Sequence, residues 1–371
     1  EKFKNIIFMP LLKGSIRPNF SSLSVDDSYN ILYAKKARMF IRTLHSFDLY
    51  KSLFFHRRTL FKKKMLIACI KQQIHVQIIK RIIKNNPSNF TEDTIVYSYW
   101  FNAPVYAFLK IRKKYRMKYR VVCRAHRWDV YDEDGDMPYR RYCIEHIDKI
   151  FPISQDACDF LTKKYGYKDK YILSRLGVQK QNVTTKESPP FNFQVLTVSQ
   201  LIQRKRVDLV LSALTEFASK NKDVNVRWTH FGTGDMEKDL KMKASSIDIP
   251  NMRTTFMGYV PNVEIMQFME ESKVDVFINL STSEGVPVSI MEAQSYGIPV
   301  IATNVGGTGE IIDKDNGILL SPCPTLENVV SALEKVYKSD FNRDIIKNHW
   351  NKLSNAQINF KRFVDILSNI Q

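Results

Sequence analysis

Short apolar runs alternate with amphipathic stretches along most of the chain. In the C-terminal half, such runs predict strands at 193–199, 224–231, 254–257, 274–280 and 299–303. Periodic apolar positions between them predict helices at 207–220, 236–244 and 263–271, followed by a largely helical final segment at 325–371. Strands that alternate with helices indicate a parallel sheet flanked by helices.

Predicted strands and helices alternate in the N-terminal half as well. Its predicted strands are 5–10, 94–100, 119–126, 149–154 and 171–174, and its predicted helices lie within 30–85 and at 106–113 and 155–165. A stretch with Thr, Ser and Pro at 180–192 is the best candidate for an interdomain linker. We therefore predict one domain over 1–185, a second over 190–345, and a helical segment over 346–371 that could cross back to the first.

Composition places the chain among globular proteins. Its 371 residues suffice for two domains of ordinary size, and 44% of them are apolar. No apolar run approaches the ~18–20 residues that a membrane span requires. The five cysteines are odd in number and scattered without C-x-x-C spacing, which favours reduced thiols in a cytoplasmic protein over disulfides or a zinc site.

The net charge of +18 is confined to the N-terminal half. Residues 1–190 contain 37 Lys and Arg against 17 Asp and Glu, whereas the remainder has a slight acidic excess. This asymmetry indicates an anionic partner such as a membrane surface, a phosphorylated lipid or a nucleic acid, although a solvated basic surface would look the same. The basic stretch 56–70 fits either a membrane-surface helix or a helix that packs on the core.

The segment 281–302 carries the strongest chemical signal. It places Glu284 and Glu292 eight positions apart, between two apolar runs that predict buried strands. Pro287 suits a first helical position and Gly297 the residue just past a helix end, so the predicted order is strand, loop, short helix, strand. Ligands bind at the carboxyl edge of open parallel sheets, and free N–H groups at the helix start would face an anion such as a diphosphate.

Other candidates follow predicted strands. Arg204 and Lys205 lie between a strand and a helix, where a cation can meet a diphosphate. Glycine turns follow later strands at Gly232 and Gly234, at Gly258 beside Tyr259, and at Gly306 and Gly307, and they would let the backbone come close to a ligand. His126 ends an N-terminal strand.

Together these residues resemble the donor-site signature of GT-B glycosyltransferases of family 4, which are retaining enzymes of bacterial polysaccharide assembly. The family pattern is a glutamate, seven residues, and a second glutamate followed by a small residue, as at Glu284 and Glu292. The resemblance covers about 95–325 and is strongest over 194–312. It implies an α/β fold of GT-B architecture, with two Rossmann-like parallel-sheet domains facing a central cleft.

The resemblance also implies roles for individual residues. Glu292 would bind the ribose hydroxyls of the donor. The catalytic group would be Glu284 near the donor sugar, Lys205 at the diphosphate, and His126 facing the sugar from the acceptor side. The other implied donor-binding residues are Gly285, Val286, Pro287, Val288, Gly232, Gly234, Gly258, Tyr259, Arg204, Gly306 and Gly307.

Two departures from the family pattern are visible. The family's phosphate-binding Gly-Arg pair is replaced by Ser199 and Gln200, so we expect Arg204 or Arg206 to substitute for the lost charge. The family's opening strand and glycine-rich loop are missing, and the chain starts at Glu1 without a methionine. We therefore expect that this chain lacks its true N-terminus.

The implied reaction moves a sugar from a nucleoside-diphosphate sugar to a hydroxyl of a lipid-linked or oligosaccharide acceptor, with retention. We expect no cofactor and no metal. The Asp-x-Asp within 132–136 could suggest a metal site, but it lies outside the nucleotide-binding half and a solvated loop is the better interpretation. The basic N-terminal half suits a cytoplasmic enzyme held peripherally at the inner, anionic membrane face.

Two rival functions remain open. A GT-B sugar-nucleotide epimerase would act on the sugar nucleotide with no acceptor present. A basic nucleic-acid-binding protein would need base-stacking aromatics or a recognised module. The sequence shows neither and the donor motifs would be unexplained, so we expect no nucleic-acid partner.

Overall fold

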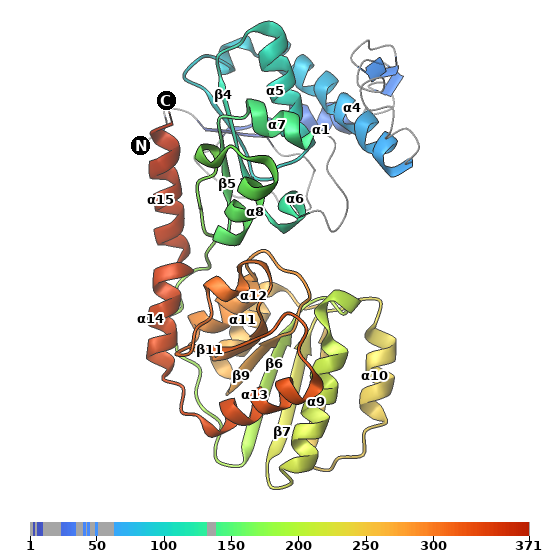
Figure 1. Ribbon diagram of the computed structural model, residues 1–371, viewed down its shortest axis with the longest axis vertical. Coiled ribbons are helices and arrows are strands. Elements are labelled where there is room, and N and C mark those ends of the chain that lie inside the picture. Colours follow the sequence, from blue (N-terminus) through green and yellow to red (C-terminus); the bar gives the residue numbers. More distant parts are fainter. Residues whose placement is uncertain are drawn as a thin grey trace. The chain divides into compact units, whose positions relative to one another are not determined.

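The computed structural model describes residues 3, 6–9, 24–34, 40–41, 43–44, 49–50, 63–131 and 139–370. The chain divides into two compact units (Figure 1). The first consists of Glu1–Pro152, Cys158–Leu173 and Ile366–Gln371, and the second of Ile153–Ala157 and Ser174–Asp365.

A parallel sheet forms the centre of the first unit. Its strand order is β3-β4-β5, and a separate pair, β1 and β2, is also parallel. The strands are β1 Ile7–Phe8, β2 Ser24–Val25, β3 Ile95–Ser98, β4 Arg120–Ala125 and β5 Lys149–Pro152. The helices are α1 Ser28–Ala34, α4 Lys63–Asn85, α5 Ala103–Tyr115, α6 Arg127–Val130, α7 Arg140–His146 and α8 Gln155–Tyr165, whose first residues belong to the second unit.

The second unit contains a six-stranded parallel sheet in the order β11-β10-β9-β6-β7-β8. Its strands are β6 Asn192–Val198, β7 Asn225–Phe231, β8 Met252–Gly258, β9 Val276–Asn279, β10 Val300–Thr303 and β11 Gly317–Leu320. Its helices are α9 Val207–Lys220, α10 Glu237–Ser245, α11 Asn262–Glu271, α12 Val288–Ser295, α13 Leu326–Lys338, α14 Arg343–Leu353 and α15 Ala356–Ser368, which ends in the first unit.

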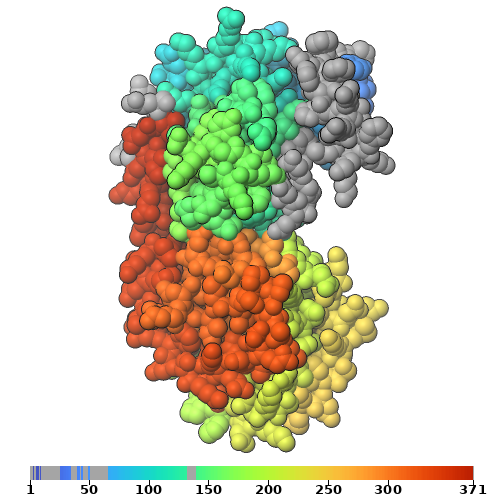
Figure 2. Space-filling model, in the orientation of Figure 1, coloured from blue at the N-terminus to red at the C-terminus, as the bar shows by residue number. Residues whose placement is uncertain are grey.

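Both faces of this sheet are covered, so its central strands are buried on both sides. In β9, Val276 and Ile278 point into one core with α9 and α13, which lie side by side over that face (Figure 1). Phe277 points into the opposite core, with apolar side chains of α11, α12 and α14. Successive side chains of a strand point to opposite faces of the sheet, so neighbouring residues of β9 enter different cores. In the space-filling view the yellow segment of α10 stands at the margin of this unit (Figure 2).

The α/β architecture with parallel sheets is confirmed, with a few local differences. The strand β11 was not predicted, because four residues that begin with a glycine show too little of a period to detect. The predicted strand at 171–174 forms only one bridge, between Tyr171 and Ile150. The basic residues at 56–62 and the acidic loop at 132–136 lie outside the described residues.

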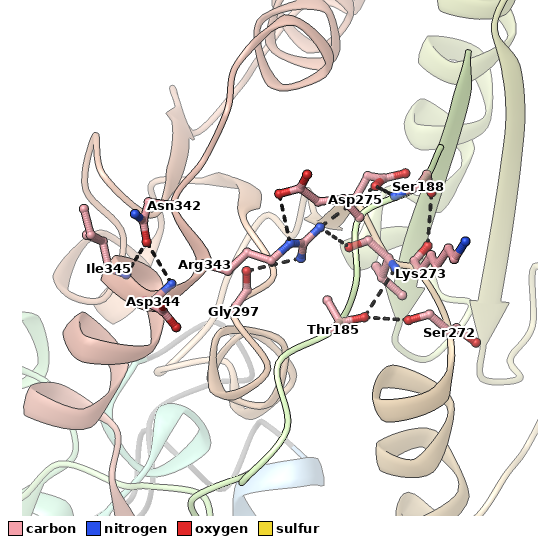
Figure 3. Close-up of polar contacts among 12 residues, drawn as sticks. Thr185, Ser188, Ser272, Lys273, Asp275, Gly297, Asn342, Arg343, Asp344 and Ile345 are labelled. Carbon is pink, nitrogen blue, oxygen red and sulfur yellow. Dashed lines mark hydrogen bonds and ion pairs between the residues drawn. The ribbon is translucent and has the colours of Figure 1, made fainter. Parts of the chain in front are cut away.

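The predicted linker stretch 180–192 lies within the second unit, which the chain enters at Ser174. The Thr185 hydroxyl donates to the Ser272 carbonyl (2.5 Å), and the Ser188 N–H donates to the Asp275 carboxylate (3.0 Å). Figure 3 shows these contacts beside Arg343, which donates to the Gly297 and Val274 carbonyls at 3.3 and 3.1 Å. The stretch is therefore fixed at the amino ends of β9 and β10.

The core between α9 and the sheet yields a stability prediction. Leu214 is fully buried in α9, so Leu214→Ala removes apolar contacts and leaves a cavity. We expect it to cost about 2–5 kcal/mol in the free energy of unfolding, measured by urea denaturation. Met242→Ala, at a side chain that is 55% exposed, is the control and should cost less than about 0.5 kcal/mol. Equal losses for the two variants would contradict this packing.

Candidate donor site

The sheet of the second unit has a topological switch point at β6. From this first strand, β7 pairs on one side and β9 on the other, so the connections after β6 and β9 leave toward opposite edges. A crevice at the carboxyl ends of such diverging strands is where open α/β sheets bind ligands. The loops that follow β6 and β9 carry Lys205 and Glu284.

Lys205 and Glu284 form an ion pair across this switch point. The Lys205 Nζ lies 2.5 Å from the Glu284 Oε1, and both side chains are largely shielded, at 16% and 12% exposure. The Asn279 amide, at the end of β9, lies 3.4 Å from the same carboxylate oxygen. The pair places an ammonium group in a weakly solvated position, where its attraction to an anion is screened less than at the surface.

The backbone holds the two loops together. The Thr282 N–H donates to the Arg204 carbonyl (2.9 Å), one residue before Lys205. The short 3₁₀ turn Gln203–Lys205 ends at Arg206, whose φ of 48° is left-handed. Arg206 points its guanidinium to the Pro322 carbonyl, to which it donates at 2.8 Å. Of the two arginines expected to replace the missing Gly-Arg contact, Arg206 is therefore engaged elsewhere, and Arg204 stays a prediction.

The helix α12 begins one residue later than predicted. Pro287 is its N-cap, with extended backbone angles, because the carbonyl of Pro287 already accepts from the Ile290 N–H (3.2 Å). The N–H groups of Val288 and Ser289 belong to the first turn of the helix. In that turn no carbonyl of the helix accepts from them, so they can donate hydrogen bonds to an anion. Gly297 has a φ of 77° just past the helix end, as predicted.

Glu292 lies in the second turn of α12 and is buried, with 8% exposure. Burial raises the pKa of its carboxyl above the ordinary value, and a hydrogen bond from Asn262 lowers it. The Asn262 Nδ2 donates to the Glu292 Oε1 at 2.9 Å. A buried carboxylate with one fixed oxygen suits recognition of neighbouring hydroxyl groups.

Two glycines allow the loop after β10 to reach the Glu284 loop. Gly306 has a φ of 53°, and a Cβ there would lie 2.0 Å from the Glu284 carbonyl oxygen. The N–H of Gly307 donates to the Gly285 carbonyl (2.6 Å), and a Cβ at Gly307 would lie 2.7 Å from the Val286 side chain. Val286 itself packs into the core, so only its backbone remains for a ligand.

The turn after β7 touches the loop after β6 in the same way. A Cβ at Gly232, whose φ is 134°, would lie 1.8 Å from the Ser199 carbonyl oxygen. A Cβ at Gly234 would lie 2.4 Å from the Leu201 carbonyl oxygen. Gly232 also donates its N–H to the carbonyl of Gly258 (2.8 Å), at the end of β8. These glycines therefore permit close backbone contact between neighbouring loops.

The loop after β8 is the most open part of this edge. Tyr259 is 82% exposed, and it precedes Asn262 at the start of α11. The contacts described above connect this loop through Gly258 to the turn that packs on the loop of Lys205, and through Asn262 to Glu292 in α12. The structure thus gathers the predicted donor residues of the C-terminal half at one edge of one sheet.

His126 belongs to the first unit, at the carboxyl end of β4. The residue is 7% exposed, its Nε2 lies 3.1 Å from the Tyr99 carbonyl oxygen, and its ring centroid lies 4.3 Å from that of Trp100. Burial, with Arg124 nearby, lowers the pKa of His126 to about 4. The ring is therefore neutral at pH 7, and its predicted role at the donor sugar remains a prediction.

Sequence reasoning missed three polar residues of the second unit. Asn262 and Asn279 contact the two glutamates, as described above. Glu310 accepts hydrogen bonds from the N–H groups of Gln155 (3.0 Å) and Asp156 (2.9 Å) and pairs with Arg175 at 2.7 Å. The proximity of Asn262 and Asn279 to strand ends was the one signal available, and it does not separate them from ordinary loop residues.

Within the described ranges no helix is long and apolar enough to cross a membrane. The same part of the chain holds no group of three or more His, Cys, Asp and Glu side chains arranged to bind a metal ion.

Solved structures share this fold. The lipopolysaccharide outer core galactosyltransferase WaaB in its apo form is 20% identical in sequence, covers 80% of each chain and has a TM-score of 0.67. The structure of HepE from Anabaena in complex with UDP and glucose is 16% identical, covers 79% of this chain and 81% of HepE, and has a TM-score of 0.62. The two parallel-sheet units therefore have the GT-B fold of glycosyltransferases.

Sequence comparison then defines the family of the second unit. Residues 179–352 match the family described as glycosyl transferases group 1, so the chain contains a glycosyltransferase group 1 domain. The amylovoran biosynthesis glycosyltransferase AmsK of Erwinia amylovora is 25% identical over 160 residues, which are 42% of this chain and 39% of AmsK. The chain spans about half the length of the curated relatives it matches.

The low pKa of His126 leads to a prediction on pH. Its imidazole should stay neutral from pH 8 down to about pH 5, with a midpoint at about 4, as followed by the NMR shifts of the histidine rings. The unfolded chain binds this proton near the ordinary pKa of about 6.5. The His126 contribution to stability is therefore fully present above about 6.5 and is lost as the pH falls toward 4.

The control for this titration is the variant His126→Gln. The histidine NMR signal that disappears in this variant is the signal of His126. Asp129 acts in the opposite direction, because burial raises its pKa to about 6, so its contribution falls as the pH rises. The dependence of the free energy of unfolding on pH must therefore be compared between the wild type and His126→Gln, because the wild type alone combines both effects. A ring midpoint near 6.5 would show that His126 is exposed to solvent and contradict the buried geometry.

Proposed function

We propose that this protein is a retaining glycosyltransferase that moves a sugar from a nucleoside-diphosphate sugar to a hydroxyl of a saccharide acceptor. The observation that carries the proposal is the shielded Lys205–Glu284 pair at the switch point of a glycosyltransferase group 1 domain. Glu284 lies on the loop that leads into the N-terminus of α12, and the same helix carries the buried Glu292.

Each part of a sugar nucleotide has a counterpart at this edge. In our assignment Glu292 accepts hydrogen bonds from the ribose hydroxyls, and the exposed loop at Tyr259 borders the base. The diphosphate lies between Lys205 and the first N–H groups of α12, and the sugar lies toward Glu284. A diphosphate would draw Lys205 from its carboxylate partner and free Glu284 to orient the sugar hydroxyls.

The reaction breaks the bond between the anomeric carbon and the diphosphate oxygen and forms a bond from that carbon to the acceptor oxygen. The acceptor hydroxyl loses its proton, and negative charge accumulates on the departing diphosphate. Lys205 and the helix N–H groups stabilise this charge, so the proposed chemistry needs no metal ion or other cofactor. Retention follows from the family resemblance.

The acceptor side of the proposal rests on the first unit. The 37 Lys and Arg of residues 1–190 favour an anionic, lipid-linked saccharide at a membrane surface, with the protein peripheral on the cytoplasmic side. The relative AmsK is an amylovoran biosynthesis glycosyltransferase, which supports a role in polysaccharide biosynthesis. His126 would face the donor sugar as a neutral ring whose Nε2–H donates to the Tyr99 carbonyl, so that Nδ1 can act only as an acceptor.

A nucleotide-binding experiment tests the donor site. Thermal unfolding is measured with UDP-, GDP-, ADP- and TDP-sugars, each without an acceptor. We expect one nucleotide class to stabilise the protein, by roughly 2.7 kcal/mol at ~100 times its dissociation constant, because the ligand binds only the folded state.

Matched variants separate the donor site from other binding modes. Glu292→Ala and Lys205→Ala should each lose most of this stabilisation, whereas Glu271→Ala, at an exposed carboxylate at the end of α11, should keep it. Stabilisation that survives in both site variants would place the nucleotide elsewhere and contradict the assignment. Absence of any shift in the wild type would contradict the proposed function.

A further inference from the structure

The carboxylate of Glu292 is held by a residue from a different helix. Glu292 lies in α12 and is only 8% exposed. Asn262 is the first residue of α11, follows the N-cap Pro261, and is exposed. Its side-chain amide nevertheless donates to the Glu292 Oε1 at 2.9 Å, although the two residues are 30 positions apart in sequence. Within the described part of the chain, this is the one side-chain donor recorded for that carboxylate.

We propose that Asn262 is a positioning residue of the donor site, which fixes Glu292 so that its second carboxylate oxygen meets the ribose hydroxyls. This inference rests on the proposed function and deepens it. A carboxylate has two acceptor oxygens, and vicinal hydroxyls are recognised best when its plane cannot rotate. The amide of Asn262 satisfies Oε1 and leaves Oε2 for the ligand.

The energetic reason for such a residue is the burial of Glu292. A buried carboxylate without a hydrogen-bond donor favours its neutral form, which would place a proton where the ribose hydroxyl must donate. Burial does raise the pKa of Glu292, and the bond from Asn262 opposes that rise. Asn262 therefore supports both the orientation and the charge of the ribose acceptor.

The position of Asn262 also explains how base and ribose recognition are coordinated. The loop between β8 and α11 contains Tyr259, which is 82% exposed and borders the base in our assignment. Asn262 directly follows this loop as the first residue of α11. One short segment therefore both lines the base and holds the carboxylate that receives the ribose, so the two subsites keep a fixed spacing.

The test compares ligands with and without ribose hydroxyls. UDP, GDP and ADP, each with its 2′,3′-dideoxy analogue, are titrated by calorimetry into the wild type and into Asn262→Ala and Asn262→Asp. For the nucleotide that binds, Asn262→Ala should weaken the ribose form about tenfold, as for loss of one hydrogen bond to a charged group. Its affinity for the dideoxy form should change less than about twofold.

Asn262→Asp keeps the size of the side chain but opposes Glu292 with a second carboxylate, so it should weaken ribose binding more than Asn262→Ala. Val263→Ala is the matched control, because the next residue of α11 is 72% exposed, and it should change neither affinity. Glu292→Ala should remove the discrimination between the two ligand forms altogether.

Each other outcome has a distinct meaning. If Asn262→Ala weakens both ligand forms equally, the residue has only a structural role, and if it weakens neither, the hydrogen bond is irrelevant to binding. Both results overturn the inference while leaving the donor site intact. If the wild type binds but does not discriminate the dideoxy form, Glu292 does not hold the ribose and the inference also fails. A wild type that binds no nucleotide contradicts the proposed function itself.

Discussion

The close approach of backbone loops at the carboxyl edge of one parallel sheet is the constraint on which the proposed site depends. At β6 the order of strands reverses, so the connections after β6 and β9 leave toward opposite edges of the sheet, and ligands of open α/β sheets bind at such a point. The Thr282 N–H bonded to the Arg204 carbonyl holds the two loops together at their start. Because these backbones are fixed, the side chains of Lys205 and Glu284 meet without either loop having to move.

Glycine makes this arrangement possible at two further contacts. A Cβ at Gly306 or Gly232 would lie 2.0 or 1.8 Å from a carbonyl oxygen of the neighbouring loop, far inside van der Waals contact. Both residues also have positive φ values, which other residues adopt at a cost. The glycines thus allow neighbouring loops to approach closely, and their contact with a ligand stays a prediction. At the opposite edge of the sheet, Arg343 donates hydrogen bonds to the Gly297 and Val274 carbonyls, which lie just before β10 and β9. Hydrogen bonds therefore fix the chain at both the amino and the carboxyl ends of these strands.

The sequence predicted much of this fold, because buried parallel strands and amphipathic helices leave strong periodic patterns. It also predicted that Glu284 and Lys205 would share one sheet edge, since each follows a strand. The Asn262–Glu292 contact could not be predicted, because it depends on which helices become neighbours after the sheet order is set. Nor could the direction of the Arg206 side chain, which donates to the Pro322 carbonyl more than a hundred positions away in sequence. The role of His126 at the donor rests on the family resemblance, and that of Arg204 on its expected substitution for the missing Gly-Arg pair, so both stay predictions.

The most direct test of the account is a crystal structure of this chain with a bound nucleoside diphosphate. Diphosphate oxygens should lie at hydrogen-bond distance, about 2.7–3.2 Å, from the Lys205 ammonium and from the first N–H groups of α12. The ribose hydroxyls should lie at Glu292, whose other oxygen still contacts Asn262. A nucleotide bound elsewhere, or a diphosphate that leaves the Lys205–Glu284 pair untouched, would contradict the account.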